Sequence, residues 1–494
     1  NYISLGFSCD DIDFKNAAIA SIDRMMEEVL DEHDVNFFDA LQNAIDNLDE
    51  INTVDNVHGI CCEYYHVMDE NERVMHREFF EKLKKYRESK IERIVPLKEK
   101  DCIVMGNKYV ELGSGKECVV DSVIHMLAEN DKMIKDAVSI PTMLCGGIYS
   151  PEIGEELLEN GVTDFVGIGK PALADPMWAK KAEEGHPEDI RPCIGCGVGC
   201  HDRGMLSGGV VQCAVNASLY KYDGPVYPQA EVSKKVIVVG AGPAGCEAAI
   251  TAKKCGHEVT LYEKRSIGGV LKEATVSDSK EDLGRLITYY ETQLKKNGID
   301  VVFEEANVDT IVKGGYDVAI LATGAKVRVP EVKGLDSKEA IYAMDFLDQG
   351  AKTDAQNIVV VGGGIVGAET ALILAEEQGK NVTITTRSPE FFVSGVMGIA
   401  YMTRLAMAGV KNCPKMQLIA IEDGKPVFVG PRGIETMDVD QVIISSGFIP
   451  TFNKLRDEIE AASDEIEVVG IGDCMAPRMV MDAVHEGYIA GINI

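Results

Sequence analysis

Short, uninterrupted apolar runs that end in glycine-bearing turns dominate the second half of the chain. Residues 236–239 and 358–361 consist only of Val and Ile, and each run leads into closely spaced glycines and then a helical segment. Continuous β-branched runs of this length are typical of parallel strands buried on both faces. Similar strands are predicted at 257–263, 316–324, 381–386, 441–447 and 468–473, with a terminal helix from Met481. The pattern predicts an α/β fold.

The longest apolar stretch, residues 358–375, raises the question of a membrane span. Four glycines and Glu369 interrupt it, so a strand, a turn and a helix explain the stretch better. We therefore expect no membrane segment.

Two further strand–helix units are predicted between residues 132 and 185. The first strand ends at a pair of glycines, a helix follows at 152–160, and the second strand runs into a glycine-containing loop at 164–171. This pattern is typical of the last two units of a TIM barrel, but generic turns capped by glycine would look the same. In a barrel, these loops would hold a phosphate through backbone N–H groups and one cation. The candidate residues are Gly146, Gly147, Gly169 and Lys170.

The N-terminal part carries much less information. Residues 1–50 hold thirteen acidic residues and only Lys15 and Arg24 as basic ones, with apolar positions at helical spacing. We expect acidic amphipathic helices and assign no function to residues 1–131. Tyr64, Tyr65 and His66 are candidate proton donors by residue type alone, so the catalytic residues stay unknown.

Composition narrows the class of partner. With 494 residues the chain should contain three or four domains, and 46% hydrophobic and 26% charged residues are ordinary for a globular protein. A formal net charge of −31 disfavours nucleic acid and anionic membranes as partners. Fourteen cysteines fit a reducing compartment, and the first residues lack the basic segment of a signal peptide. We expect a soluble, cytoplasmic protein.

Four closely spaced cysteines are the strongest chemical signal. Three lie within eight residues with glycines between them, and the fourth follows after twelve more residues. Thiolates at this spacing can bind one iron–sulfur cube, because glycine lets a loop fold tightly around a cluster. Zinc is the competing interpretation, although structural zinc sites usually present two paired C-x2-C units. The predicted metal ligands are Cys193, Cys196, Cys200 and Cys213.

The first glycine-rich turn has the spacing of a dinucleotide-binding fingerprint. Its glycines are expected to allow a tight turn, close approach of a pyrophosphate and helix–strand packing. The next strand ends in an acid whose carboxylate can accept hydrogen bonds from a ribose. Two later turns, after the strands at 316–324 and 468–473, return to the same domain. The candidate residues are Gly240, Gly242, Gly245, Glu263, Thr323, Gly324, Gly472 and Asp473.

A second fingerprint follows at Gly362, Gly364 and Gly367, so one nucleotide domain is expected inside another. The strand after it ends in Thr386-Arg387 rather than in an acid. Loss of the acid beside a guanidinium favours the 2′-phosphate of NADP, unless Arg387 is only a solvated strand-end charge.

Together these motifs resemble the iron–sulfur flavoenzyme family of 2,4-dienoyl-CoA reductase, 2-enoate reductase and trimethylamine dehydrogenase over residues 132–494. The resemblance implies 4Fe-4S, FAD, NAD(P)H and FMN as cofactors. It also implies the C-terminal part of a TIM-like barrel, because fewer than 200 residues precede Cys193. The expected domains are 1–131, acidic helices or an altered barrel; 132–185, last barrel units; 186–228, cluster loop and linker; 229–350, FAD domain; 351–440, inserted NAD(P) domain; 441–494, FAD domain again.

The expected chemistry follows from these parts. A nicotinamide gives up two electrons together, whereas a cluster carries one at a time, so a flavin is needed between them. The leading hypothesis is an enzyme that reduces an activated C=C bond of a small unsaturated substrate with electrons from NAD(P)H. Two alternatives stay open: a subunit that delivers electrons to a partner protein, and an amine dehydrogenase with reversed flow. The substrate and any homo-oligomeric state are left open.

Overall fold

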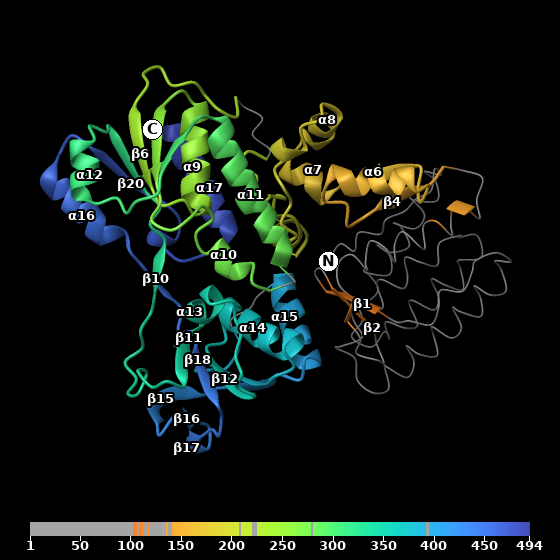
Figure 1. Cartoon of the computed structure of the whole chain (residues 1–494), viewed down its shortest axis with the longest axis vertical. Helices are drawn as coiled ribbons and strands as arrows, with labels where there is room; N and C mark the ends of the chain where they lie inside the picture. The colour runs from red at the N-terminus through yellow and green to blue at the C-terminus, as the bar shows by residue number, and fades with distance from the viewer. Residues whose placement is uncertain are drawn as a thin grey trace, which may run out of the picture. The chain divides into compact units, whose positions relative to one another are not determined.

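The computed structural model describes most of the chain after residue 140 (Figure 1). The described residues are 102–105, 108–111, 117–118, 132, 135–136, 141–206, 209–219, 225–277, 280–391 and 395–494. The helices expected in residues 1–50 and the candidate proton donors Tyr64, Tyr65 and His66 lie outside them. Within the expected helix-rich region, β1 (Cys102–Met105), β2 (Lys108–Glu111) and β3 (Glu117–Cys118) form an antiparallel sheet that the sequence pattern did not predict.

Two parallel strands form the predicted barrel-like segment. Strand β4 (Met143–Cys145) pairs with β5 (Phe165–Gly167), and α6 (Pro151–Glu159) connects them. Ser150 caps α6, since its hydroxyl accepts a hydrogen bond from the Ile153 N–H. Because both strands run the same way, the turns after them lie at one edge of the sheet. Helices α7 (Lys170–Ala174) and α8 (Trp178–Glu183) then lead to the short helix η1 (Pro187–Asp189).

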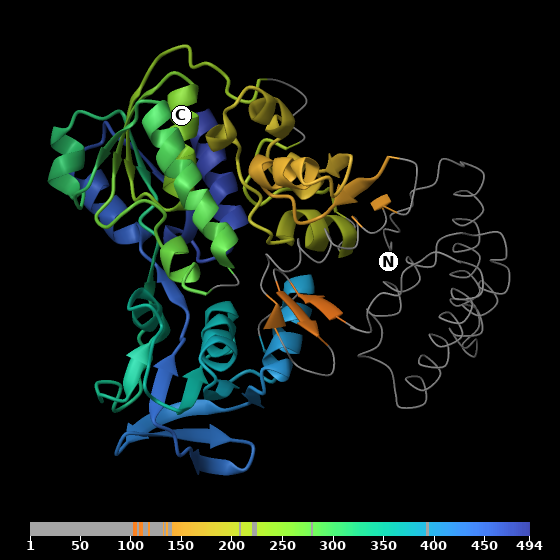
Figure 2. The same ribbon diagram turned by 45° about the vertical axis from the view of Figure 1, so that its right-hand side comes forward.

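The first nucleotide domain is built on a five-stranded parallel sheet in the order β20-β9-β6-β7-β8. The central strand has apolar side chains on both faces, with Val236 and Val238 in one core and Ile237 and Val239 in the other. Helices cover both faces (Figures 1 and 2). The strands are β6 (Lys235–Val239), β7 (Glu258–Tyr262), β8 (Asp300–Val302), β9 (Val318–Leu321) and β20 (Glu467–Gly470). The helices are α9 (Pro243–Lys254), α11 (Glu281–Lys296) and α17 (Val480–Asn493) on one face, and α12 (Val308–Lys313) and α16 (Phe452–Ala462) on the other.

The second nucleotide domain repeats this plan with the strand order β11-β18-β12-β13-β14. Helices cover one face of the sheet, and the antiparallel meander β15-β16-β17 covers the other (Figure 2). The sheet strands are β11 (Ala340–Tyr342), β12 (Asn357–Val361), β13 (Asn381–Thr386), β14 (Lys411–Pro414) and β18 (Gln441–Ile444). The helices are α13 (Ala343–Asp348), α14 (Ile365–Leu372) and α15 (Gly395–Met407), and the meander comprises β15 (Gln417–Glu422), β16 (Lys425–Gly430) and β17 (Gly433–Thr436).

The inserted domain is longer than the expected 351–440. Strand β11 pairs with β18, and β18 pairs with β12, so residues from 340 to 444 contribute to the second sheet. We expected β11 and β18 in the FAD domain, and this placement is wrong. A short apolar strand does not indicate which of two similar sheets it joins, because both offer the same parallel edge. The chain passes between the domains through an antiparallel pair, β10 (Ala325–Val327) and β19 (Phe448–Pro450).

Among the described residues, no helix combines the length and the apolar character needed to cross a lipid bilayer.

Candidate functional site

The four predicted metal ligands line one cavity. Cys193 and Cys196 lie in an irregular segment after η1, Cys200 lies in the π-helical turn η2 (Val198–Leu206), and Cys213 follows that turn. The cavity has about 320 Å³ of space not filled by atoms, part of it open to solvent. Gly199 is required here, because a Cβ at this position would lie 2.5 Å from the carbonyl oxygen of Gln212. The loop therefore folds back on itself around the cavity.

The spacing of the sulfur atoms suits a cluster better than a single ion. In the described part of the chain, only His186, Glu188 and Asp189 form a group of potential ligands whose atoms all lie within 4.8 Å of one another. No three of the four sulfurs are that close. Thiolates on one zinc ion, with bonds of about 2.3 Å, would lie about 3.8 Å apart. An iron–sulfur cube holds its thiolates at separate corners, which are farther apart.

The electrostatics of the cavity also fit a bound metal centre. Burial raises the pKa of the thiols of Cys193, Cys196 and Cys213, that of Cys196 to about 12. A cationic centre overcomes this cost, because it binds the deprotonated sulfur. One buried thiol, that of Cys193, and two half-buried ones, those of Cys196 and Cys213, around one cavity are therefore a donor set suited to iron.

Lys170 lies closer to the cysteines than expected. It begins α7 and lines the same cavity, and its Nζ lies 5.9 Å from the centre of the Tyr149 ring. Burial lowers the pKa of this ammonium, but Tyr149, Cys193 and Cys200 outweigh burial and raise it. The turn that carries Lys170 also lies at the same sheet edge as Gly146 and Gly147. The chain thus places one cation beside both the candidate phosphate loops and the candidate cluster.

A histidine that the sequence did not single out contacts the cluster loop. His485 of α17 has Nε2 2.9 Å from the carbonyl oxygen of Cys213. Since a carbonyl oxygen only accepts, this nitrogen carries the hydrogen and donates it. The neighbouring Glu486 accepts a hydrogen bond of 2.7 Å from the Gly472 N–H. Helix α17 therefore contacts both the cysteine loop and the Gly472 turn.

The first fingerprint has the geometry of a dinucleotide-binding turn. A Cβ on Gly240 would meet the Ala322 carbonyl oxygen at 2.4 Å, and one on Gly245 would meet the Gly240 carbonyl oxygen at 1.8 Å. Around the Cβ position of Gly242, by contrast, the described residues other than its chain neighbours place no atom within 4 Å. Two glycines are thus required by packing, while the middle one opens to free space at the N-terminus of α9. A pyrophosphate binds in this position in Rossmann-like folds.

The other predicted residues of this domain lie at the carboxyl ends of its strands. Glu263 follows β7 and is buried, and its carboxylate accepts hydrogen bonds from the N–H groups of Ala241 (2.8 Å) and Arg265 (2.6 Å). It keeps lone pairs for a ribose hydroxyl. Asp473 follows β20 in the short helix η5 (Gly472–Cys474) and accepts a hydrogen bond of 3.0 Å from the Arg478 N–H. Burial raises the pKa of Asp473.

Thr323 and Gly324 follow β9 at the same sheet edge. The Thr451 hydroxyl donates to the Gly324 carbonyl oxygen at 2.7 Å, so it accepts the hydrogen bond of 2.8 Å from the Thr323 hydroxyl. The two segments that pass to and from the inserted domain are joined here by side chains.

The second fingerprint repeats the geometry of the first. Cβ atoms on Gly362 and Gly367 would each lie 1.9 Å from a carbonyl oxygen, whereas Gly364 at the N-terminus of α14 has free space. Arg387, directly after β13, is exposed. Glu369 forms an ion pair with Lys280 and accepts a hydrogen bond of 2.5 Å from the Tyr401 hydroxyl. The Glu369 carboxylate raises the pKa of Lys280 despite burial, so its own role includes holding this cation.

Comparison with known proteins supports the combination of a barrel-like part with two nucleotide-binding folds. Residues 234–476 match the family described as pyridine nucleotide-disulphide oxidoreductase, and residues 51–189 match the NADH:flavin oxidoreductase / NADH oxidase family. The NADH oxidase of Thermoanaerobacter brockii is 35% identical over 373 residues, which cover 72% of this chain and 56% of the relative. The cinnamate reductase of Clostridium sporogenes is 35% identical over 374 residues, which cover 74% of this chain and 55% of that relative.

A solved structure of 2-naphthoyl-CoA reductase, in complex with 2-naphthoyl-CoA, matches with a TM-score of 0.69 and 31% identity. The match covers 75% of this chain and 56% of that one. The chain belongs to the 2,4-dienoyl-CoA reductase-like family of flavoenzymes. It spans just over half the length of the relatives it matches.

As a 2,4-dienoyl-CoA reductase-like flavoenzyme, the chain combines a TIM-barrel-like part with nested Rossmann-like domains, which confirms the predicted fold class. The family match begins at residue 51, well before the expected start of the resemblance at 132. Proteins of this family bind FMN, FAD and NAD(P)H and usually a 4Fe-4S cluster. The free space at Gly242 and Gly364 and the cavity lined by four cysteines are the features of this chain that fit those groups.

Proposed function

We propose that this protein is an NAD(P)H-dependent oxidoreductase that reduces an activated C=C bond of a small enoate or acyl-CoA. In the net reaction, NAD(P)H loses a hydride to become NAD(P)⁺, and the C=C bond gains that hydride and one proton. The cofactors would supply a route for the electrons from NAD(P)H through FAD and the 4Fe-4S cluster to FMN.

The observation that carries this proposal is the position of the four-cysteine cavity. It is lined on one side by Lys170, which follows a barrel-like strand, and His485 connects its Cys213 to the helix that follows the Gly472 turn. A relay is useful only between two separate redox sites. Lys170 belongs to the proposed FMN site on one side of the cavity, and the Gly472 turn belongs to the proposed FAD site on the other. Relatives named cinnamate reductase and 2-naphthoyl-CoA reductase support an unsaturated acyl substrate.

Residues of this chain have distinct proposed tasks. Gly242 and Glu263 would contact the pyrophosphate and a ribose of FAD, with Thr323, Gly324, Gly472 and Asp473 around the rest of that cofactor. Gly364 would contact the NAD(P)H pyrophosphate, and Gly146, Gly147, Gly169 and Lys170 would hold the FMN phosphate. Cys193, Cys196, Cys200 and Cys213 would ligate iron.

The function is tested on the full-length protein under anaerobic conditions. Iron, FAD and FMN are counted per chain, NAD(P)H is added until the visible absorbance bleaches, and cinnamate or an aromatic enoyl-CoA is then supplied. We expect both flavins, bleaching, and return of colour with formation of the saturated acid. A reduced protein that no conjugated enoate or enoyl-CoA reoxidises would contradict the proposal.

The same measurement separates the two alternatives. One FAD per chain without FMN, and rapid reduction of an external one-electron acceptor, would favour an electron-transfer subunit. Reduction of the protein by a methylated amine in the absence of NAD(P)H would favour an amine dehydrogenase. The open position at Gly364 favours a working nicotinamide site and therefore the reductase.

Coenzyme choice is proposed to depend on Arg387. Its guanidinium is exposed directly after β13, where a 2′-phosphate would lie in a Rossmann-like fold. Replacing it by glutamine should raise KM for NADPH about tenfold, because a hydrogen bond to a charged group contributes about 1.5–3 kcal/mol. The KM for NADH serves as the control and should change little. Equal effects on both coenzymes would exclude a phosphate contact.

We further propose that the protein acts in the cytoplasm, in line with its cysteine content and the reducing conditions that an iron–sulfur centre favours. A homo-oligomer and a docked electron-transfer partner are both compatible with its acidic composition.

A further inference from the structure

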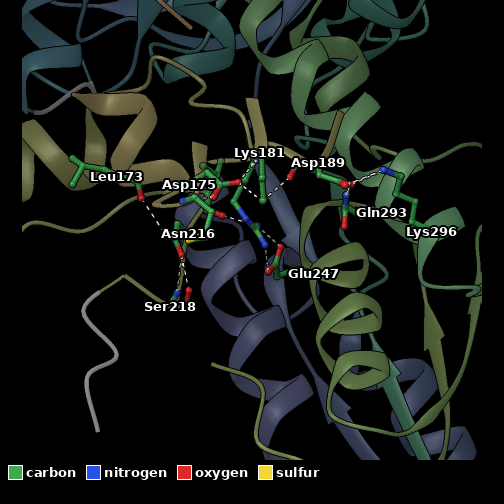
Figure 3. A network of polar contacts seen from close by, with 12 residues as sticks. Leu173, Asp175, Lys181, Asp189, Asn216, Ser218, Glu247, Gln293 and Lys296 are labelled. Atoms are coloured by element: carbon green, nitrogen blue, oxygen red, sulfur yellow. Dashed lines mark hydrogen bonds and ion pairs between the residues drawn. The ribbon is translucent and has the colours of Figure 1, made fainter. Parts of the chain in front are cut away.

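A buried charge pair joins the cysteine loop to the first nucleotide domain (Figure 3). Arg191, two residues before Cys193, forms two hydrogen bonds of 2.7 and 2.9 Å with the carboxylate of Glu247 in α9. The side chains are 9% and 2% exposed, respectively. Bidentate pairs of this kind fix orientation as well as distance. The contact bridges 56 residues of sequence, so no local pattern predicts it.

Arg191 also closes the cysteine loop on itself. Its Nη1 donates to the carbonyl oxygen of Val215 at 2.6 Å, and Val215 lies two residues after Cys213. Its backbone N–H donates to Asp175 at 2.8 Å, and Asp175 also accepts from Lys181. One side chain therefore connects the segment before the first cysteine, the segment after the last cysteine and helix α9.

The surroundings of the pair keep it dry and charged. The guanidinium lies over the Tyr289 ring, 5.1 Å from its centre, and the Tyr290 hydroxyl donates to Glu247 at 3.3 Å. Burial alone would lower the pKa of Arg191, but Glu247 outweighs burial and raises it well above its ordinary value. The guanidinium stays close to the ligand segment, since its Nη1 donates to Val215, two residues after Cys213.

We propose that the Arg191–Glu247 pair is a positioning device that fixes the cluster loop to α9 and cancels, beside the cluster, two charges that would each shift its reduction potential if left unpaired. This inference rests on the iron–sulfur centre of the proposed function. A cluster gains one negative charge on reduction, so a nearby unpaired cation favours the reduced form and an unpaired anion favours the oxidised form. With the pair intact, the two effects largely cancel. Removing the Glu247 charge should therefore raise the reduction potential, and removing the Arg191 charge should lower it.

The test is a redox titration of the full-length holoprotein, followed by the EPR signal of the reduced cluster. E247Q keeps the shape of the side chain and leaves Arg191 unpaired. It should raise the reduced-to-oxidised ratio at a fixed potential about tenfold, which is about 59 mV for a one-electron couple. R191Q should lower the ratio by a similar factor. R191K keeps the charge and should restore a potential near that of the wild type.

Two further variants make the test decisive. The double variant R191Q/E247Q removes both charges, should titrate near the wild-type potential, and stands in if R191Q alone does not fold. K296Q is the control. Lys296 lies at the end of the same network, in an exposed ion pair with Glu188 and Asp189, so its replacement should leave the potential unchanged (Figure 3). A wild-type potential in iron-loaded E247Q would overturn this inference and leave the proposed iron–sulfur centre standing. Wild-type protein without iron would overturn the proposed centre and this inference with it.

Discussion

Replacement of Cys196 by alanine is expected to remove the cluster and leave FAD bound. Cys196 lies in the middle of the cysteine loop, and burial holds its thiol pKa near 12, so the deprotonated form depends on a bound cation. A cube that loses one of four thiolates should bind far more weakly. Even groups outside the ligand sphere of metal sites change affinity about 10–100-fold. We expect iron per chain to fall by at least about tenfold.

The measurement combines iron and sulfide analysis, FAD content and the EPR spectrum after chemical reduction. Cys413 provides a matched control, since it lies on β14 in the other nucleotide domain, away from the cysteine loop. C413A should keep both iron and FAD. Full iron content in C196A, or zinc in the wild-type protein, would refute the assignment of this loop.

Replacement of Gly364 by valine should abolish use of NAD(P)H without affecting the other cofactors. Apart from its own residue and its two chain neighbours, no atom of the described residues lies within 4 Å of a Cβ at Gly364, and its φ of −81° suits any residue. The added side chain therefore meets only what binds at the N-terminus of α14. Blocking the pyrophosphate there should raise KM for NAD(P)H at least about 30-fold, a loss of about 2 kcal/mol.

Gly242 in the first fingerprint offers the reciprocal experiment. It has the same position at the N-terminus of α9, the same free space and a φ of −71°. G242V should purify without FAD, whereas G364V should retain FAD and iron and fail only in reduction by NAD(P)H. Thermal unfolding of both variants checks that the folds persist. Wild-type KM in G364V would exclude this turn as the nicotinamide nucleotide site.

The sequence predicted what depends on local geometry. Gly245 is required by its contact with the Gly240 carbonyl oxygen inside one strand–turn–helix unit, so the spacing of the two glycines indicated the unit, whereas Gly240 itself is required by Ala322 after a distant strand. In the second fingerprint Gly367 is likewise required by Gly362, and Gly362 by the distant Ser445. The cysteine loop is equally local, and its four ligand positions do line one cavity.

Contacts between distant segments could not be predicted in the same way. His485 lies 272 residues from Cys213, and Lys280 lies 89 residues from Glu369, and neither contact leaves a periodic signal. The sheet to which β18 belongs depends on its partner strand β12, which its own apolar composition does not reveal. Parallel strands buried on both faces look alike, so the boundary of the inserted domain was misplaced for a physical reason.

The ladder between β10 and β19 has a consequence for protein engineering. Val327 lies opposite Phe448, so the chain leaves the first nucleotide domain and re-enters it through neighbouring strands. The segment between them is therefore a cassette whose two ends are held one ladder spacing apart. Exchanging it for the corresponding segment of a relative requires only two closely spaced junctions. If the inserted domain binds NAD(P)H as proposed, such an exchange should transfer coenzyme preference and leave the first nucleotide domain intact.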